Sequence, residues 1–263
     1  MAQAIFKSWF VDFNPVHAKA NALADGASDE QATLSAMSVI SGKSADELNA
    51  MNRQNPEHYQ KLWEIANAFP SGFDGEVPLG WGVSTIGESY HVDMGQSPKG
   101  ETYNELGDGV LFYQGRAEFG WRYPSPRLYT TDPKRMAKQG DVLMSVRAPV
   151  GDMNIALEDC CIGRGLCALR HKSGFLSFGV YQLQAMKAVF DVFNGEGTVF
   201  GSINQKDLKG LSVVSPPVRI MKIFDEMVNL FDIIIKEQTC ENLSLVTIRD
   251  GLLPKLLSGK IKT

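Results

Sequence analysis

Apolar residues in the last part of the chain recur at alternating steps of four and three positions, which is the spacing of a coiled-coil seam. The pattern predicts one helix that begins at Pro216, with Ser215 as its N-cap, and ends at Pro254. Gln238 and Glu241 interrupt the seam and could fix its register. The predicted helix-pairing residues are Ile220, Phe224, Met227, Phe231, Ile234, Leu245, Ile248 and Leu252.

A helix over these residues would be about 57 Å long, at 1.5 Å per residue. That length is too great for the seam to be buried against one small domain. We therefore expect the helix to pair with a partner helix. An ordinary long surface helix is the alternative, and the pattern alone leaves it open.

The first 79 residues show helical patterns. In residues 2–13, one helical face carries an aromatic stripe that we expect to pack on the long helix, formed by Ile5, Phe6, Trp9, Phe10 and Phe13. Further short helices are predicted to begin at two capping boxes and at an Asn-Pro pair: Ser28 with Gln31, Ser44 with Glu47, and Asn55 with Pro56. Glycine and proline in PSGFDGEVPLG (70–80) indicate a boundary after this helical segment.

Short apolar runs bounded by turn residues follow from Gly80. The runs WGVSTI (81–86), GVLFY (109–113), DVLMSV (141–146) and LCALR (166–170) have the composition of strands in a twisted sheet. A helix is predicted over 176–193 and a last strand over 211–214. Together these patterns predict an α+β fold in three parts: an N-terminal helical segment (1–79), one globular domain with a twisted β-sheet (80–215), and the long coiled-coil helix (216–263).

The charge pattern adds a candidate nucleic-acid surface. The chain as a whole carries a net charge of −4, and residues 1–79 are acidic. Positions 116–147, however, hold seven basic and three acidic residues, with aromatic residues between them. A basic, aromatic and loop-rich stretch is typical of a surface that faces DNA. A solvated face of a β-rich domain would have the same composition, so both interpretations remain at this point.

Candidate DNA contacts are cationic side chains that can bind phosphates and polar side chains that can reach base edges. The predicted DNA-binding residues are Gln96, Ser97, Lys99, Gln114, Arg116, Arg122, Arg127, Arg147, Ser202 and Asn204. Arg147 could instead satisfy backbone carbonyls near Pro149. Arg164, between two glycines, is expected to be structural, although close backbone approach there would also suit a phosphate. Tyrosine and tryptophan residues are expected in the core more than in base stacking.

No pattern for catalysis is found. The sequence has no G-x-x-x-x-G-K-[ST] loop, no glycine-rich loop suited to S-adenosylmethionine, and no motif of an amino-methyltransferase. The histidines are scattered, and the cysteines lack zinc-ligand spacing, so we expect no metal, no cofactor and reduced cytosolic thiols: His17, His58, His91, His171, Cys160, Cys161, Cys167 and Cys240. No apolar run reaches membrane-spanning length, and no secretory signal is recognised. These patterns indicate a cytoplasmic binding protein rather than an enzyme.

Eight segments resemble landmarks of one family, the DNA-specificity (S) subunits of Type I restriction–modification systems. The segments are AQAIFKSWFVDFNPV (2–16), GWGVSTIGE (80–88), YQGRAEFGWRYPSPRLYTT (113–131), GDVLMSVRAPVGD (140–152), CIGRGLCALR (161–170), GTVFGSINQKDLKGL (197–211), SPP (215–217) and IRDGLLPKLLSGKI (248–261). Full-length members have two target recognition domains and two long helices, whereas this chain resembles a half-length form with one of each.

The resemblance implies a non-catalytic subunit that recognises a split target in double-stranded DNA. Its partners would be a methyltransferase (M) subunit that modifies adenine and a motor-nuclease (R) subunit. A symmetric dimer of half-length chains would imitate the two-domain form and recognise a palindromic target.

Two alternatives to this function remain. The acidic N-terminal segment would suit a regulatory or decoy protein that binds partner subunits without productive DNA recognition. The chain could also be the recognition arm of a methyltransferase whose catalytic domain has been lost or lies on another chain.

Overall fold

The computed structural model describes residues 1–195 and 201–258. The other residues, which include parts of the segments 197–211 and 248–261 named above, lie outside the described residues. The chain forms two compact units, Met1–Asp225 and Glu226–Thr263, which we call unit 1 and unit 2. The predicted division at 79/80 and 215/216 stays a prediction.

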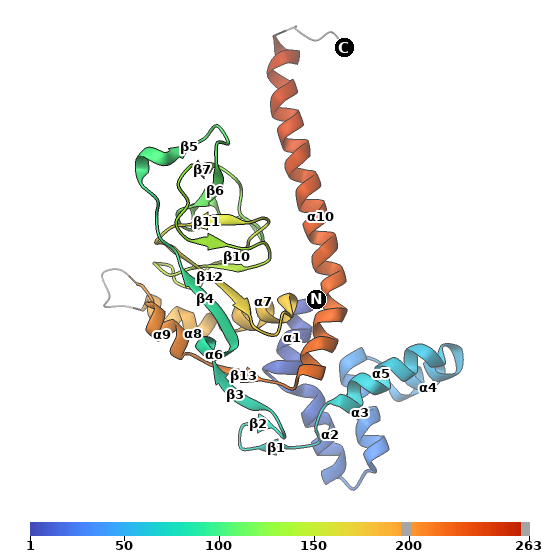
Figure 1. Ribbon diagram of the computed structural model, residues 1–263. Coiled ribbons are helices and arrows are strands. Elements are labelled where there is room, and N and C mark those ends of the chain that lie inside the picture. Colours follow the sequence, from blue (N-terminus) through green and yellow to red (C-terminus); the bar gives the residue numbers. More distant parts are fainter. Residues whose placement is uncertain (196–200, 259–263) are drawn as a thin grey trace. The chain divides into compact units, whose positions relative to one another are not determined.

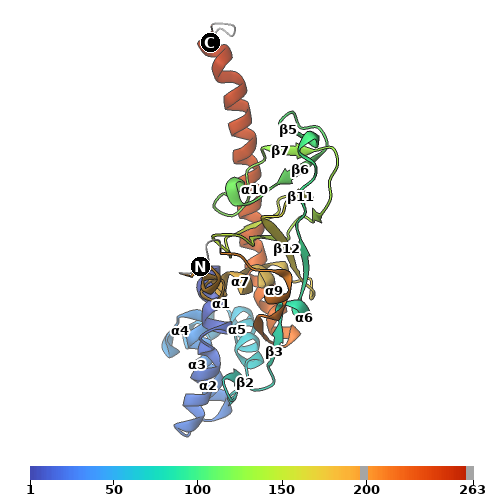
Figure 2. The same cartoon turned by 90° about the vertical axis from the view of Figure 1, so that its left-hand side faces the viewer.

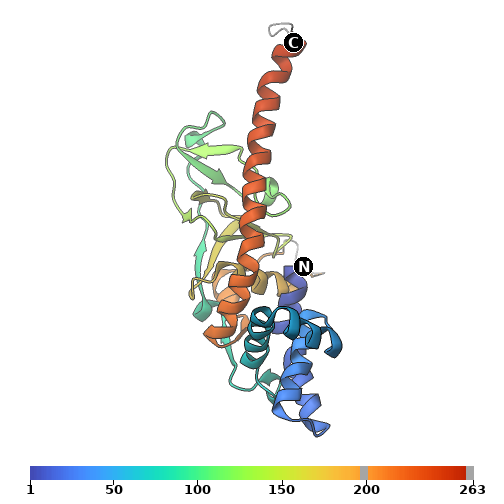
Figure 3. The ribbon, with the colours of Figure 1, turned by 90° about the vertical axis from the view of Figure 1, so that its right-hand side faces the viewer.

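Unit 1 begins with five helices, α1 to α5, whose starts follow the predicted caps. Ser28 and Ser44 each accept the backbone N–H of the third helical residue and complete a capping box, and Asn55 accepts the N–H of His58. Figures 2 and 3 show α2–α5 as one group below the larger sheets. The helices are α1 (Ala2–Phe10), α2 (Asn14–Ala24), α3 (Asp29–Ser41), α4 (Ala45–Gln54) and α5 (Pro56–Ala68).

Phe6, Trp9 and Phe10 of the predicted aromatic stripe are buried, and one part of the prediction is corrected. Helix α1 ends at Phe10, so Phe13 does not share its face. Phe13 instead has a left-handed backbone (φ 50°) at the start of α2, and its ring packs edge-on against Trp81 at 5.7 Å. The chain therefore turns sharply between the two helices, which a continuous helical period over 2–13 does not predict.

The stripe packs on the first turns of the long helix, as expected. The ring of Phe224 lies 5.3 Å from that of Phe6 and 5.4 Å from that of Phe10, both edge-on. Phe178, from a helix far along the chain, completes the cluster at 5.2 Å from Phe10. Edge-to-face aromatic pairs of this kind add to the apolar area that burial removes from water.

The middle of unit 1 contains two main sheets rather than the single sheet predicted. A four-stranded antiparallel sheet has the order β10-β9-β12-β4, and a mixed five-stranded sheet has the order β5-β7-β6-β11-β8 (Figure 1). The first is built from β4 (Tyr90–Met94), β9 (Val142–Ser145), β10 (Met153–Ile155) and β12 (Leu166–His171). The second is built from β5 (Tyr103–Asn104), β6 (Val110–Tyr113), β7 (Leu128–Thr130), β8 (Met136–Ala137) and β11 (Cys160–Ile162).

Smaller strand pairs and short helices complete this part of unit 1. The hairpin β1 (Phe73–Asp74) with β2 (Val77–Pro78) precedes β3 (Gly82–Thr85), which pairs with β13 (Ser212–Ser215) in antiparallel register. The predicted helix over 176–193 is broken at Met186 into α7 and α8 and ends in a 3-10 turn. The remaining helices are α6 (Ile86–Ser89), α7 (Leu176–Ala185), α8 (Lys187–Asp191) and α9 (Gln205–Gly210).

The long helix α10 spans Val218–Leu257, and both predicted ends are corrected. Ser215 is the last residue of β13, paired with Gly82, so it cannot be the helix cap. The carbonyl of Pro217 accepts the first helical N–H groups, from Ile220 and Met221. At the other end Pro254 lies inside the helix, and its own carbonyl still accepts the N–H of Ser258.

Ile220 and Phe224, the first two predicted helix-pairing residues, are buried in unit 1. Their apolar surface is already covered by the same chain, so they do not present a seam to another helix. The exposed part of the predicted seam lies in unit 2. It consists of Phe231, Ile234, Leu245, Ile248 and Leu252.

His171 is a half-buried histidine that is expected to make the stability of unit 1 depend on pH. His171, at the end of β12, packs edge-on against Tyr90 at 4.9 Å and Phe178 at 5.3 Å. Its Nδ1 accepts the backbone N–H of Ser173 at 3.2 Å, which fits the neutral ring. Burial lowers the pKa of His171 to about 4, because charging the ring here would cost solvation.

We expect unit 1 to lose about 1 to 2 kcal/mol of stability through His171 as the pH falls from 7 to 5. In this window the unfolded chain binds a proton at His171 and the folded chain does not. Denaturation of the wild type and of His171→Phe at both pH values measures the difference, since the phenylalanine keeps an aromatic ring but does not titrate. His91→Gln, at an exposed histidine, serves as the control and should keep the wild-type pH dependence. A His171→Phe variant with that same dependence would contradict the assignment.

Candidate nucleic-acid interface

Six predicted DNA-binding residues come from loops that meet at one end of the four-stranded sheet. Strand β12 starts there at Leu166, opposite the end of β9 at Ser145 and next to the end of β4 at Met94. The loops that follow β4 and β9, and the turn that precedes β12, therefore converge. They contribute Gln96, Ser97 and Arg147, joined by Gln114 after β6 and by Ser202 and Asn204 before α9.

The turn between β11 and β12 holds these loops together. Residues 163–165, Gly-Arg-Gly, connect the five-stranded sheet to the four-stranded sheet. The N–H of Gly163 donates to the carbonyl of Tyr113 at 2.8 Å, and the N–H of Gln96 donates to that of Ile162 at 2.9 Å. The N–H of Arg164 donates to Oγ of Ser97 at 3.3 Å. Backbone bonds from two strand ends and one loop thus fix this turn.

Two glycines permit the close approach. A Cβ at Gly95 would lie 2.1 Å from the carbonyl oxygen of Gly163, and a Cβ at Gly163 would lie 2.8 Å from the backbone of Gln114. Both distances are shorter than van der Waals contact. Glycine is therefore required at this crossing because of space, and the crossing sets where Arg164 projects.

A cleft of about 520 Å³ opens beside this turn, and we call it the arginine cleft. Arg147 and Ser202 form a backbone bridge across it, and the N–H of Ile203 donates to the carbonyl of Val146 at 3.0 Å. No carboxylate belongs to its lining, as far as the described residues show, so its charge comes from two arginines. The lining is Met94, Val146, Arg147, Ala148, Arg164, Gly201, Ser202, Ile203 and Asn204.

Arg147 and Arg164 are the exposed cations of the cleft. Within residues 1–195 and 201–258, neither side chain has a carboxylate at ion-pair distance. A guanidinium group without an intramolecular partner stays available for an anion, and planar forked donors suit phosphate and base edges alike.

The other predicted arginines have partners within unit 1. Arg116 forms an ion pair with Asp152. Arg122 donates to the hydroxyl of Tyr181 at 3.2 Å and lies over its ring. These contacts compete with DNA for the side chains, so a role of either arginine in DNA binding stays a prediction.

Among these arginines, Arg127 has two carboxylate partners within the chain. It donates to Glu118 at 2.6 Å and lies 3.5 Å from Glu105. The side chain of Glu118 is only 4% exposed, and this carboxylate raises the pKa of Arg127 further above its usual value. Releasing Arg127 to DNA would leave a buried carboxylate without its cation, which is costly.

The polar candidate residues differ in whether their side chains already have partners within the chain. Lys99 is exposed and lies 3.8 Å from Glu101, a pair that solvent screens. Asn204 caps α9, because its Oδ1 accepts the N–H of Asp207 at 2.9 Å while its Nδ2 donates to the Asp207 carboxylate. Gln96, Gln114 and Ser202 are exposed beside the cleft.

Sequence reasoning missed two residues on this part of the molecule. Arg164 was expected to be structural, yet its side chain is exposed in the cleft and only its backbone is bound. Trp121 was expected in the core with the other aromatics, yet it is 84% exposed. The glycines on both sides of Arg164 were the available signal, because they indicate a tight turn whose central side chain points outward.

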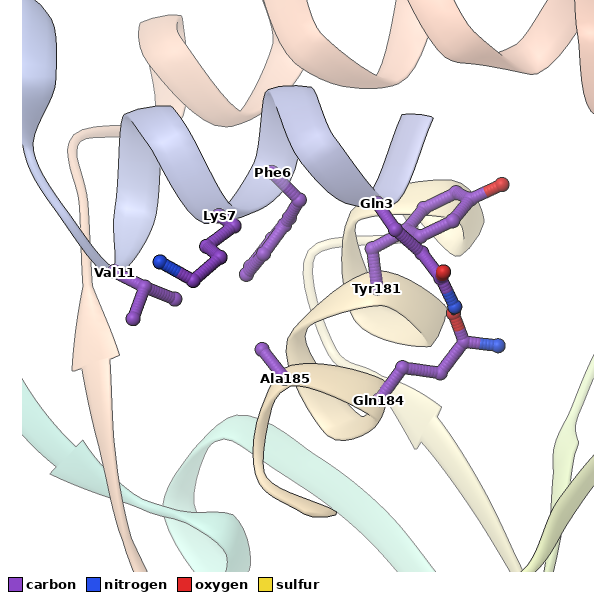
Figure 4. A pocket seen from close by; sticks show the side chains of 7 residues that line it. All are labelled: Gln3, Phe6, Lys7, Val11, Tyr181, Gln184 and Ala185. Carbon is purple, nitrogen blue, oxygen red and sulfur yellow. The ribbon is translucent and has the colours of Figure 1, made fainter. Parts of the chain in front are cut away.

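A second cavity, of about 250 Å³, lies between α1 and α7 (Figure 4). Gln3 donates to Gln184 at 3.0 Å at one end, and Phe6 and Ala185 line the interior. The one cation in its lining, Lys7, is paired with Asp12. This cavity has no set of converging polar groups for chemistry.

Over the described residues, no three His, Cys, Asp or Glu side chains come together as a metal site. Cys160, Cys161 and Cys167 are buried, and burial raises the pKa of Cys160 to about 12, which keeps its thiol protonated. The described helices include none with the length and hydropathy to cross a membrane.

Comparison with known proteins gives consistent matches. No protein-family model matches the chain. The putative type I restriction enzyme MjaX specificity subunit of Methanocaldococcus jannaschii is 38% identical over 192 residues, which cover 72% of this chain and 45% of that protein. The type I restriction enzyme HindI specificity subunit of Haemophilus influenzae is 31% identical, with 99% of this chain and 61% of that protein covered. This chain thus spans about half of the length of these relatives.

Comparison with solved structures also identifies similar chains. The HsdS subunit of Thermoanaerobacter tengcongensis has a TM-score of 0.51 at 30% identity, covering 87% of this chain and 57% of that one. A chain from a study of complex assembly and conformational transition in a type I restriction–modification system has a TM-score of 0.52 at 32% identity, covering 86% and 58%. Together with the α+β architecture and the long C-terminal helix, these matches show that the chain belongs to the family of Type I restriction enzyme specificity (HsdS) subunits.

Proposed function

We propose that this chain is a sequence-specific DNA recognition subunit of a Type I restriction–modification complex. It binds double-stranded DNA and has no catalytic activity or cofactor of its own. M and R subunits supply methylation, translocation and cleavage. The relatives named above are specificity subunits, and the present chain spans about half of their length, so the function is carried over to it as a proposal.

The observation that carries the proposal is the convergence at the arginine cleft. Loops from two sheets bring two unpaired arginines together with exposed amide and hydroxyl side chains, among them Gln96, Gln114 and Ser202. Cations that bind phosphates, beside neutral groups that can reach base edges, are what a DNA-recognition surface needs.

The proposal is tested by co-expressing the chain with a Type I M subunit and using the complex to select DNA from a randomised duplex library. We expect enrichment of one split sequence motif. A chain that assembles with the M subunit but enriches no motif would be the decoy protein considered above. Methyl transfer to DNA by the chain alone would overturn the non-catalytic role.

We further propose that unit 2 mediates a homodimer. Its exposed seam, Phe231, Ile234, Leu245, Ile248 and Leu252, has side chains that are 41% to 55% exposed along one helix. A row of large apolar side chains is unfavourable in water and typical of a helix that pairs. Two antiparallel copies would place two recognition domains about a twofold axis, which fits a palindromic target.

Ile248→Glu is expected to convert the dimer into a monomer, because it places a charge in the apolar seam. Light scattering at several concentrations should give about twice 28.9 kDa for the wild type and 28.9 kDa for the variant. Thr247→Glu adds the same charge to an exposed neighbouring position off the seam and should remain dimeric. A wild type that is monomeric at all concentrations would contradict the homodimer and leave the seam to a partner subunit.

A further inference from the structure

We propose that Arg164 binds a DNA backbone phosphate, with Arg147 on the same anion-binding cleft, and so fixes the register of the recognition domain on the duplex. This inference rests on the proposed function, and it assigns a role to a residue that was expected to be structural. Neighbouring amides and hydroxyls are left to discriminate between bases.

The first argument is the rigidity of the turn. Arg164 lies between Gly163 and Gly165 in a turn that backbone hydrogen bonds join to the ends of β6 and β11. Its own N–H is bound by Ser97. A side chain on so fixed a backbone loses less freedom when it binds a ligand, which favours a positioning contact.

The second argument is charge. Two guanidinium groups line one cleft, and they repel each other unless an anion lies between or beside them. Among the described residues, neither guanidinium has a carboxylate at ion-pair distance, and no carboxylate lines the cleft. The cleft therefore attracts an anion from outside the chain, and the anion that DNA offers is its phosphate.

The third argument concerns why the arginines would bind a phosphate and leave the base edges to other side chains. A cleft of about 520 Å³ is open enough for a phosphate group to approach both arginines. Adenine presents one donor and one acceptor in the major groove, which the amide of a glutamine can match, whereas an arginine offers donors only. Gln96 and Gln114 carry such an amide, and the backbone of each is hydrogen-bonded to residues at or next to the turn.

The test uses fluorescence anisotropy of the chain of 263 residues with a 30-base-pair duplex of random sequence, between 50 and 200 mM KCl. Non-specific binding depends on phosphate contacts, so no target sequence needs to be known. We expect Arg164→Ala to weaken binding roughly tenfold at 50 mM KCl and to reduce the slope of log K against log salt by about one. Arg164→Lys should recover most of the affinity, because a phosphate accepts a point charge.

Control variants distinguish a failure of the inference about Arg164 from a failure of the proposed function. Arg53→Ala removes an equal charge from an exposed position on α4 and should leave affinity unchanged, and thermal denaturation should show that all variants fold. If the wild type binds DNA and Arg164→Ala binds equally well, the inference fails while the proposed function stands. If Arg164→Lys recovers nothing, or the salt slope does not change, phosphate binding is wrong. If the wild type binds no duplex at 50 mM KCl, either alone or in complex with an M subunit, both the inference and the proposed function fail.

Discussion

Replacing Phe224 by alanine is expected to destabilise unit 1 by about 3–5 kcal/mol. The ring is fully buried and packs against five aromatic side chains from two other helices. Those helices, α1 and α7, are far apart in the sequence, so Phe224 is the point where the start of α10 is held to both. Alanine would leave a cavity that rigid rings cannot fill, because aromatic side chains have few alternative rotamers. Urea denaturation followed by tryptophan fluorescence measures the change.

Phe231→Ala on the same helix provides the matched control. Phe231 occupies the same predicted seam but lies in unit 2, where it is 49% exposed. We expect the control to change the unfolding free energy of unit 1 by less than about 1 kcal/mol. Equal losses from the two variants would mean that the seam is energetically uniform, and the division of α10 between core and exposed seam would then be wrong.

Local signals in the sequence predicted most of the elements. Helix starts at Ser28, Ser44 and Asn55 were predictable because a cap and its helix are neighbours in sequence. The strands β3, β6, β9 and β12 were predictable because their apolar runs are bounded by turn residues. The α+β class follows from these elements together.

What the sequence could not predict depends on long-range packing. The period of α10 continues without a change at Asp225, yet Phe224 is in the core and Phe231 is exposed. Ser215 has the chemistry of a cap, but pairing with Gly82 in a distant strand takes it into β13. In both cases a contact across more than a hundred residues decides between two locally acceptable states.

The candidate site shows the same division. The residue types that could bind DNA were visible in the sequence, but not which of them keep their side chains free. Arg127 and Arg147 have similar local surroundings in sequence, and only the fold places Glu118 against Arg127. The importance of Arg164 follows from the meeting of β6, β11 and the Gln96 loop, which no short-range pattern contains.

Replacing Gly95 by alanine is expected to destabilise unit 1 by about 3 kcal/mol and to weaken DNA binding as well. The added Cβ would lie 2.1 Å from the carbonyl oxygen of Gly163 and 2.8 Å from that of Leu166, both of them backbone atoms. Backbone atoms of paired strands cannot move aside as a flexible side chain can, so the cost lies at the upper end for overpacking. This clash is relieved only if the loop that carries Gln96 moves away from the Gly163–Gly165 turn.

Gly100→Ala is the matched control for this substitution. Gly100 lies in the same loop region, where a Cβ would meet nothing within 4 Å. We expect Gly100→Ala to keep wild-type stability and DNA affinity, as measured by urea denaturation and by anisotropy with the random duplex. If Gly95→Ala lost stability but bound DNA as tightly as the wild type, the crossing would be needed for folding alone. A joint loss would indicate that the contact between the two sheets is also what holds Arg164 toward the phosphate, because the alanine removes no charge and no hydrogen-bonding side chain from the arginine cleft.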